Sequence, residues 1–384
     1  MKSTRLETLA VHGGEMRPPP ERSVAMPIYQ SSTFVTAGEE GDYHDIRYMR
    51  LSNTPNHDVL HRKLALLEGT EAALVTGSGM AAISTTLLAL LTSGDHVLAQ
   101  DCLYGGTHDF LTKDFPGFGL SVSFLSPEQP DAWAQLLTPR TKLIYVESVS
   151  NPLLRVIDLE RVVAFARAHG LISVIDNTFP SPVNFNPAAM GFDVVLHSAT
   201  KYLNGHTDLV AGAVMGPAKL VHRIKHKLDH LGGTLDAHTC SLLHRGLKTL
   251  VLRVRYQNDS CLALARHLAG HAAVAHVNHT GLPEHPDHAR ASRWFRGHGG
   301  VLSFELKGGV DAARRLLDRL QLPFNAPSLG GVETLITRPC TTSHSGIAPD
   351  TRRALGISDG LVRVSVGIEA TEDLVADFDQ ALSA

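Results

Sequence analysis

Cysteine is scarce in this sequence, with four residues in a chain of 384. The four are Cys102, Cys240, Cys261 and Cys340. Their spacing contains no C-x-x-C pair and matches neither a disulfide framework nor a zinc site. The sequence is therefore not typical of a small disulfide-rich secreted fold or of a zinc module, and we expect no metal ion in the site.

Long hydrophobic runs and an excess of positive charge are also missing. The longest apolar run, residues 80–91, is interrupted by hydroxyl side chains and is too short to span a bilayer. Residues 1–14 mix charged with apolar side chains and do not resemble a signal peptide. The formal net charge of −3 at pH 7 provides no broad positive field. We therefore expect a cytoplasmic protein that binds neither nucleic acid nor membranes.

Three regions of the sequence differ in pattern. Residues 1–45 are rich in proline and glycine and predict an irregular arm, which is either ordered against the body or a partner subunit, or disordered. Residues 46–245 alternate short apolar runs with helix-like segments, which indicates a large α/β domain with a mainly parallel sheet covered on both faces. Residues 246–384 follow a looser pattern and predict a smaller C-terminal α+β domain.

The apolar runs in these regions predict strands, and the periodic segments predict helices. The expected strands are residues 73–76, 96–100, 121–126, 142–147, 172–176, 194–197, 211–215, 301–306 and 361–367. The expected helices are residues 58–68, 80–91, 159–169, 246–268, 311–320 and 371–382.

Sheets of this kind bind ligands at the carboxyl ends of their strands, so the strand exits are the places to look for a site. The first exit is a glycine-rich turn, residues 76–82, that opens a helix. Free N–H groups and the positive end of the helix dipole favour a phosphate there, near Gly79 and Met80. Tight packing is the alternative explanation for such a turn.

Two further exits carry ionisable groups. Asp176 ends an apolar strand, where a carboxylate needs a cation or a donor; the protonated ring nitrogen of pyridoxal phosphate (PLP) is one such partner, and a helix cap or a salt bridge is the alternative. Lys201 follows the next strand, and burial there makes its amine a nucleophile. Ser198 and Thr200 stand close enough to the lysine in sequence to donate to a phosphate. The three exits together predict a PLP site.

The segment from His197 to Tyr202, followed by Gly205, His206 and Asp208, resembles the lysine signature of the PLP-dependent Cys/Met metabolism family. That family contains cystathionine gamma-synthases, cystathionine gamma- and beta-lyases, and methionine gamma-lyases. The resemblance extends over the whole chain and implies the PLP-dependent transferase fold (fold type I). It implies that Lys201 forms the internal aldimine, and that Ser198 and Thr200 hold the phosphate with the backbone of Gly79 and Met80.

The resemblance assigns further cofactor residues. Tyr104 matches the tyrosine that stacks on the PLP ring and takes part in proton transfer. Tyr48 and Arg50 match a pair that reaches the phosphate of the neighbouring subunit. This placement implies active sites shared within dimers, and we expect a homotetramer built from such dimers.

The resemblance also assigns the substrate, an amino acid, to a second group of residues. Glu147 and Asn151 match positions around the ring and substrate, and Ser328 and Glu333 match a substrate-recognition segment. Arg363 matches the arginine that grips the α-carboxylate, for which a guanidinium is well suited. Considered without the family, an arginine in a strand would be assigned to an ordinary salt bridge.

The reaction type is predicted from four residues. Val332 and Glu333 are more similar to the gamma-type synthases and lyases than to the bacterial beta-lyases, which carry an aromatic residue there. Gly106 stands where methionine gamma-lyases carry a cysteine. Arg47 stands where cystathionine gamma-enzymes usually carry an acid, which favours a substrate with a distal anion. We expect a carbon–sulfur lyase acting on cystathionine or a related sulfur amino acid by beta- or gamma-elimination; the alternative is a gamma-replacement synthase that joins an O-acylhomoserine to a thiol.

Other protein classes are less consistent with the sequence. A non-enzymatic descendant of the fold would have lost Lys201, Asp176 or Tyr104, and all three are present. The pairs His226/His230 and His267/His271 lack the glutamate of an H-E-x-x-H motif and are typical of solvated helix faces. An aminotransferase of the same fold would not need the motifs around Tyr48 and Ser328.

Overall fold

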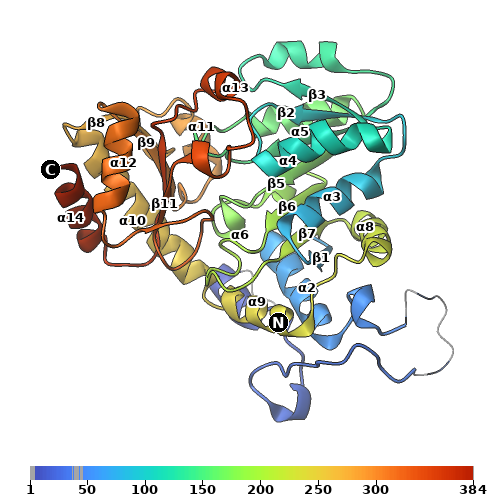
Figure 1. Cartoon of the computed structure of the whole chain (residues 1–384). Coiled ribbons are helices and arrows are strands. Elements are labelled where there is room, and N and C mark those ends of the chain that lie inside the picture. Colours follow the sequence, from blue (N-terminus) through green and yellow to red (C-terminus); the bar gives the residue numbers. More distant parts are fainter. Residues whose placement is uncertain (1–4, 37, 39–42, 44–45, 384) are drawn as a thin grey trace.

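The computed structural model describes residues 5–36, 38, 43 and 46–383, and its main features are two β-sheets (Figure 1). The larger sheet has seven strands in the order β1-β7-β6-β5-β4-β2-β3. Its strands are β1 (Ala72–Thr76), β2 (His96–Gln100), β3 (Ser121–Leu125), β4 (Thr141–Glu147), β5 (Ile172–Asp176), β6 (Val194–Ser198) and β7 (Gly212–Gly216). Strands β6, β5, β4, β2 and β3 are parallel, and β7 pairs antiparallel with β1 and β6. The predicted mainly parallel α/β sheet is confirmed.

Helices cover both faces of the larger sheet because its strands are apolar on both sides. On one face, Leu87 of α3 and Ile224 of α8 belong to the same hydrophobic cluster as Leu196 of β6. On the other face, α2, α5 and α9 pack against alternate residues of the same strands. The helices of residues 5–247 are α1 (Leu6–His12), α2 (Pro55–Glu68), α3 (Gly79–Leu90), α4 (Gly105–Asp109), α5 (Leu159–Ala168), α6 (Ser181–Asn184), α7 (Pro187–Met190), α8 (Ala218–Leu231) and α9 (Ala237–Leu247).

The smaller sheet is formed by the C-terminal part of the chain and lies beside the larger one, in orange and red in Figure 1. Its strand order is β10-β11-β12-β9-β8. The strands are β8 (Val274–Asn278), β9 (Val301–Leu306), β10 (Phe324–Asn325), β11 (Leu335–Thr337) and β12 (Val362–Ser365). The helices are α10 (Leu250–Gly270), α11 (His288–Trp294), α12 (Gly309–Arg319), α13 (Pro349–Ala354) and α14 (Thr371–Leu382). A third hydrophobic cluster joins α10, α12 and α14 to this sheet.

Two predictions of local structure are corrected here. The helix expected over residues 246–268 is in fact the end of α9 and most of α10, separated at Lys248 and Thr249. The arm is not irregular throughout, because α1 is helical and packs against α2 and α10. Lys63 of α2 is fully buried and donates to the carbonyl of Ala10 at 2.9 Å, which supplies a partner at the end of α1. Part of the predicted arm, within residues 1–4 and 37–45, lies outside the described residues.

The strand register places three strand exits at one edge of the larger sheet. Glu147 at the end of β4 is in register with Asp176 at the end of β5. Strand β6, parallel to β5, ends at Ser198, three residues before Lys201. The division into domains at residue 245 stays a proposal; that residue lies inside α9. Within the described chain, every helix is too short or too polar to cross a bilayer.

Candidate active site

A large cavity of about 700 Å³ opens at this sheet edge, a volume typical of ligand sites. Its walls come from both halves of the chain, because strand ends of the larger sheet face loops of the C-terminal part. The lining residues of the larger-sheet half are Ser78, Gly79, Met80, Ile83, Tyr104, Glu147, Val149, Asn151, Asp176, Thr178, Phe179, Ser198, Thr200, Lys201 and Val210. Those of the C-terminal half are Pro327, Ser328, Leu329, Thr341, Thr342, Ser343 and Arg363.

Lys201 lies in this cavity just beyond the end of β6. Its Nζ donates to Ser328 Oγ at 2.6 Å. Burial, together with the positive charge of Arg363, lowers the pKa of Lys201 to about 8. About a tenth of the amine is therefore unprotonated at pH 7, far more than for an ordinary lysine, and a carbonyl-attacking amine must be unprotonated. Ser328 has a φ of 96°, a backbone conformation that is uncommon outside glycine and is often found at functional sites.

The amino end of α3 forms a second wall. Ser78 caps the helix by accepting a hydrogen bond from the Ala81 N–H at 2.9 Å, and Gly79 and Met80 follow it at the positive end of the dipole. A Cβ on Gly79 would lie 2.9 Å from Ser198 Oγ, so only glycine lets strand β6 and α3 come this close. Thr200 also lines the cavity, but its hydroxyl exchanges hydrogen bonds with the backbone of Ala211. The four residues predicted to hold the phosphate within one chain, Gly79, Met80, Ser198 and Thr200, thus line the same cavity.

Asp176 and Glu147 line the cavity at the ends of β5 and β4. Asp176 Oδ1 accepts from Thr178 N at 2.9 Å and from Thr178 Oγ1 at 2.5 Å. Glu147 Oε1 accepts from Tyr104 N at 2.7 Å, which fixes the backbone at the start of α4. Removal from water raises the pKa of both carboxyl groups, and that of Glu147 is raised well above its usual value, by burial first and by the charge of Asp176 second.

Tyr104 stands at the mouth of the cavity, 44% exposed. A Cβ on Gly106 would lie 2.7 Å from Tyr104 Cε1 and 3.1 Å from Met80 Sδ. The absence of a side chain at position 106 therefore allows the tyrosine ring to adopt its place beside Met80.

Arg363 of β12 reaches the cavity from the smaller sheet. Its Nη1 donates to Asn151 Oδ1 at 3.0 Å and its Nη2 to the carbonyl of Ser328 at 2.8 Å. Burial lowers the pKa of Arg363 to about 10, so the side chain stays charged at neutral pH. Its Nε is buried with no hydrogen-bond partner among the described residues. A buried donor without a partner is costly, and a bound carboxylate would satisfy it.

Three predicted site residues lie outside the cavity of their own chain. Arg50 donates to the carbonyl of Asp229 and to the hydroxyl of Tyr43, and its guanidinium lies 5.6 Å from the ring of Tyr48. Glu333 Oε2 accepts from Thr207 Oγ1 at 2.8 Å. Arg47, from which a substrate with a distal anion was inferred, forms a salt bridge with Asp58 at 3.1 Å.

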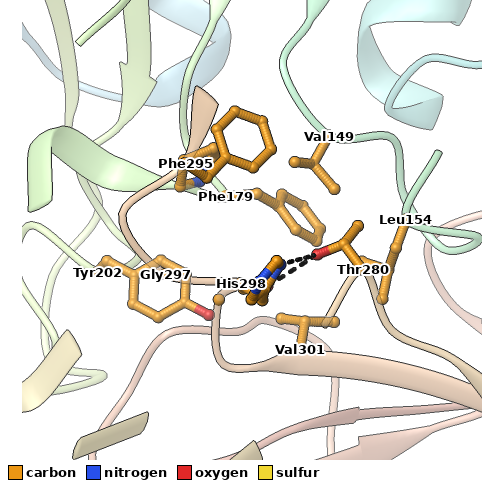
Figure 2. A pocket seen from close by; sticks show the side chains of 11 residues that line it. Val149, Leu154, Phe179, Tyr202, Thr280, Phe295, Gly297, His298 and Val301 are labelled. Atoms are coloured by element: carbon orange, nitrogen blue, oxygen red, sulfur yellow. Dashed lines mark hydrogen bonds between the residues drawn. The ribbon is translucent and has the colours of Figure 1, made fainter. Parts of the chain in front are cut away.

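A second cavity (Figure 2) shares Val149 and Phe179 with the first. Its volume of about 10 Å³ has room for roughly one water molecule. His298 Nδ1 lies 3.2 Å from Thr280 Oγ1, and the rest of the wall is mostly aromatic and apolar. This cavity is too small to be a substrate site. In the part of the chain that the structure describes, no group of three His, Cys, Asp or Glu side chains is arranged to hold a metal ion.

Several lining residues were not predicted from the sequence. Thr178 had a local signal, because a hydroxyl two residues after a strand-end aspartate is well placed to donate to it. Residues 341–343 and Val210 had none, since they reach the cavity only through the packing of distant loops.

The arrangement fits PLP on the observations of this structure. A helix amino end with glycine and hydroxyl neighbours could hold the phosphate, the Lys201 amine could hold the aldehyde carbon, and Asp176 could face the ring nitrogen. The orphaned Nε of Arg363 then remains for the carboxylate of an amino acid. The fold and the cavity therefore define a PLP-dependent enzyme of the α/β type.

Comparison with known proteins identifies the family. Residues 7–383 match the model of the Cys/Met metabolism PLP-dependent enzymes, and the chain belongs to that family. It is 40% identical to L-methionine gamma-lyase of Pseudomonas putida, over 97% of this chain and 94% of that protein. It is 38% identical to the chloroplastic cystathionine gamma-synthase 1 of Arabidopsis thaliana, over 98% of this chain and 69% of that protein.

A solved structure supports the same assignment. The crystal structure of cystathionine gamma-lyase from Lactobacillus plantarum, complexed with L-serine, superposes with a TM-score of 0.93. The two chains share 34% sequence identity, and the match covers 99% of this chain and 98% of the other. The predicted family, fold and PLP dependence are confirmed; the relatives include both lyases and synthases.

Proposed function

We propose that this enzyme is a carbon–sulfur lyase that acts on cystathionine or a related sulfur amino acid by beta- or gamma-elimination. The observation that carries the proposal is the distribution of charge in the cavity. Among the described lining residues, the acidic and basic side chains are Glu147, Asp176, Lys201 and Arg363, and the other lining residues, such as Val210 and Thr342, are uncharged. Elimination needs a cation for the α-carboxylate and an amine that moves the α-proton. Arg363 and Lys201 can take these two tasks without a second amino acid in the cavity.

Four of the lining residues have a task in such an elimination. Arg363 binds the α-carboxylate, and Lys201 removes the α-proton and later returns a proton. Asp176 would keep the proton on the ring nitrogen of the cofactor. PLP, when bound, delocalises the electron pair that remains at Cα. Tyr104, at the cavity mouth, would pack against the cofactor and assist proton transfer.

The leaving group departs as a thiol, and water completes the reaction. Gamma-cleavage of cystathionine with one water gives cysteine, 2-oxobutyrate and ammonia. Beta-cleavage gives homocysteine, pyruvate and ammonia. The identity of the keto acid therefore distinguishes the two positions.

The shared site within a dimer belongs to this proposal. Tyr48 and Arg50 do not line the cavity of their own chain, and Arg50 lies beside the ring of Tyr48. These two residues can take the cofactor-binding role that the family resemblance implies if they reach the phosphate in a neighbouring subunit. We propose a homotetramer built from such dimers, and the molar mass of the purified enzyme from light scattering would test this. We also propose that the enzyme is located in the cytoplasm.

Gamma-replacement by an O-acylhomoserine and a thiol is the second candidate, because the chain is also similar to a cystathionine gamma-synthase. The test is the product profile of the holoenzyme with L-cystathionine, L-homocysteine, L-cysteine, and O-acylhomoserine plus cysteine. Keto acid and thiol from a sulfur amino acid support the lyase. Cystathionine formed from the acylhomoserine, without keto acid, overturns it. Lys201→Ala is the control for the background reaction.

A further inference from the structure

Two carboxyl groups line the cavity at the ends of neighbouring strands. Glu147 and Asp176 end neighbouring parallel strands, and the register pairs them directly. Both line the cavity, and Glu147 is only 5% exposed. Two carboxylates in such a place repel each other, and little water is present to screen the repulsion. We therefore expect the pair to carry one negative charge and one proton.

The hydrogen-bond donors around the two groups are unequal. Asp176 Oδ1 accepts two hydrogen bonds, both from Thr178. The Thr178 hydroxyl itself accepts from the Ser198 N–H at 2.8 Å, so its own hydrogen is directed at Asp176. Glu147 accepts one hydrogen bond among the described residues, from Tyr104 N. Donors stabilise the charged form of a carboxyl group, so the charge belongs on Asp176.

The other ionisable groups nearby do not reverse this preference. Lys201 and Arg363 donate to Ser328 and Asn151 rather than to either carboxyl group. The imidazole of His197 pairs with Glu68 at 3.1 Å, and a positive charge there would favour a charged Asp176 further.

Two further ionisable side chains interact electrostatically with the pair. They are Tyr145 of β4 and Cys102, which follows the end of β2, and burial raises the pKa of both. The Tyr145 and Cys102 side chains stay neutral, so they add no charge that could compete with the donors on Asp176.

We propose that Thr178 is a positioning residue that places the shared charge on Asp176 and leaves Glu147 a neutral acid. Asp176 is then always charged opposite the ring nitrogen of PLP. Neutral Glu147 still accepts the Tyr104 N–H and keeps one O–H available as a donor. The inference uses the PLP dependence of the family but is independent of the choice between lyase and synthase.

Infrared difference spectra of the holoenzyme at neutral pH test the location of the proton. We expect Glu147→Gln to remove a carbonyl-stretch band of a protonated carboxylic acid. If that variant loses only carboxylate bands, the proposal is overturned. No substrate is present in this experiment, so its failure is distinct from failure of the proposed reaction.

Substitutions of Thr178 test the cause. Thr178→Val keeps the backbone donor and removes the hydroxyl, so the Glu147 acid band should weaken as charge moves toward Glu147. The dissociation constant for PLP should rise about tenfold, the lower end of the loss of a hydrogen bond to a charged group. Thr178→Ser should restore both values.

A merely structural role of Thr178 predicts a different pattern. In that case Thr178→Val lowers the melting temperature while the acid band stays at full intensity, and this result would overturn the proposal. In a Glu147→Gln background no second carboxyl group competes for the charge. The PLP dissociation constant should then rise much less on Thr178→Val, and an equal rise in both backgrounds would contradict the inference.

Discussion

Arg363 offers a sharp test of the site because the chain contains a matched control. Arg363 and Arg253 are both 4% exposed, and burial lowers the pKa of each to about 10. Arg253 donates to the carbonyls of Tyr202 and Gly246 at 2.9 Å and does not line the cavity. The two arginines are therefore similar in burial and charge and differ in access to a substrate.

Arg363→Lys keeps the positive charge but removes the planar fork that can bind a carboxylate through two N–H groups. The loss of one hydrogen bond between charged groups is worth about 1.5–3 kcal/mol. This corresponds to a fall of roughly 10- to 100-fold in kcat/KM, at 1.4 kcal/mol per tenfold. Arg253→Lys should lower the melting temperature but leave kcat/KM near that of the wild type.

The assay compares steady-state kinetics of both variants on a free amino acid and on its methyl ester. The fall for Arg363→Lys should be confined to the free acid, because the ester lacks the charge that the guanidinium binds. PLP absorbance and thermal unfolding report whether each variant is folded and loaded. The reasoning is refuted if Arg253→Lys loses as much kcat/KM as Arg363→Lys, or if Arg363→Lys loses acid and ester equally.

Three further predictions concern other parts of the chain. Lys201→Ala should abolish turnover and the visible absorbance of the enzyme–PLP complex while the melting temperature of the apoenzyme changes little; spectra and calorimetry measure this. Burial disfavours the charge on Glu15, but its ion pairs with His244, Lys63 and Lys248 outweigh burial and lower the pKa from 4.5 to about 2, so their contribution to stability is complete above pH 4.5 and is lost as pH falls through 2. Denaturant unfolding of Glu15→Gln should show that loss at pH 7, and equal stability of both proteins would contradict it. Gly106→Cys should displace the Tyr104 ring, lowering kcat and shifting PLP absorbance, whereas unchanged spectra would show that the ring has room.

The strand exits were predictable from the sequence because they depend on local pattern. A run of buried β-branched residues followed by Asp176 or Lys201 shows both the strand and the side chain that follows it. The parallel order of the strands then brings these exits to one edge. The same reasoning extends to Gly79, where a turn opens a helix.

The C-terminal contribution to the site was not predictable in this way. Strand β8 was missed because two of its five residues are exposed and its apolar pattern is weak. Ser328 and Arg363 were assigned only through a family resemblance, since they meet Lys201 across 127 and 162 residues of chain. Long-range packing of this kind leaves no periodic signal in a single sequence.

Ser328 shows why the cofactor and the docking of the two halves are energetically linked. Its hydroxyl accepts from Lys201 of the larger-sheet half, and its carbonyl accepts from Arg363 of the smaller sheet. Two residues later, a Cβ on Gly330 would lie 2.7 Å from Tyr202 N, so this segment rests directly on the lysine loop. A ligand that contacts Lys201 and Arg363 together binds only when the halves are packed. By mass action such a ligand therefore stabilises the packed form of the two halves.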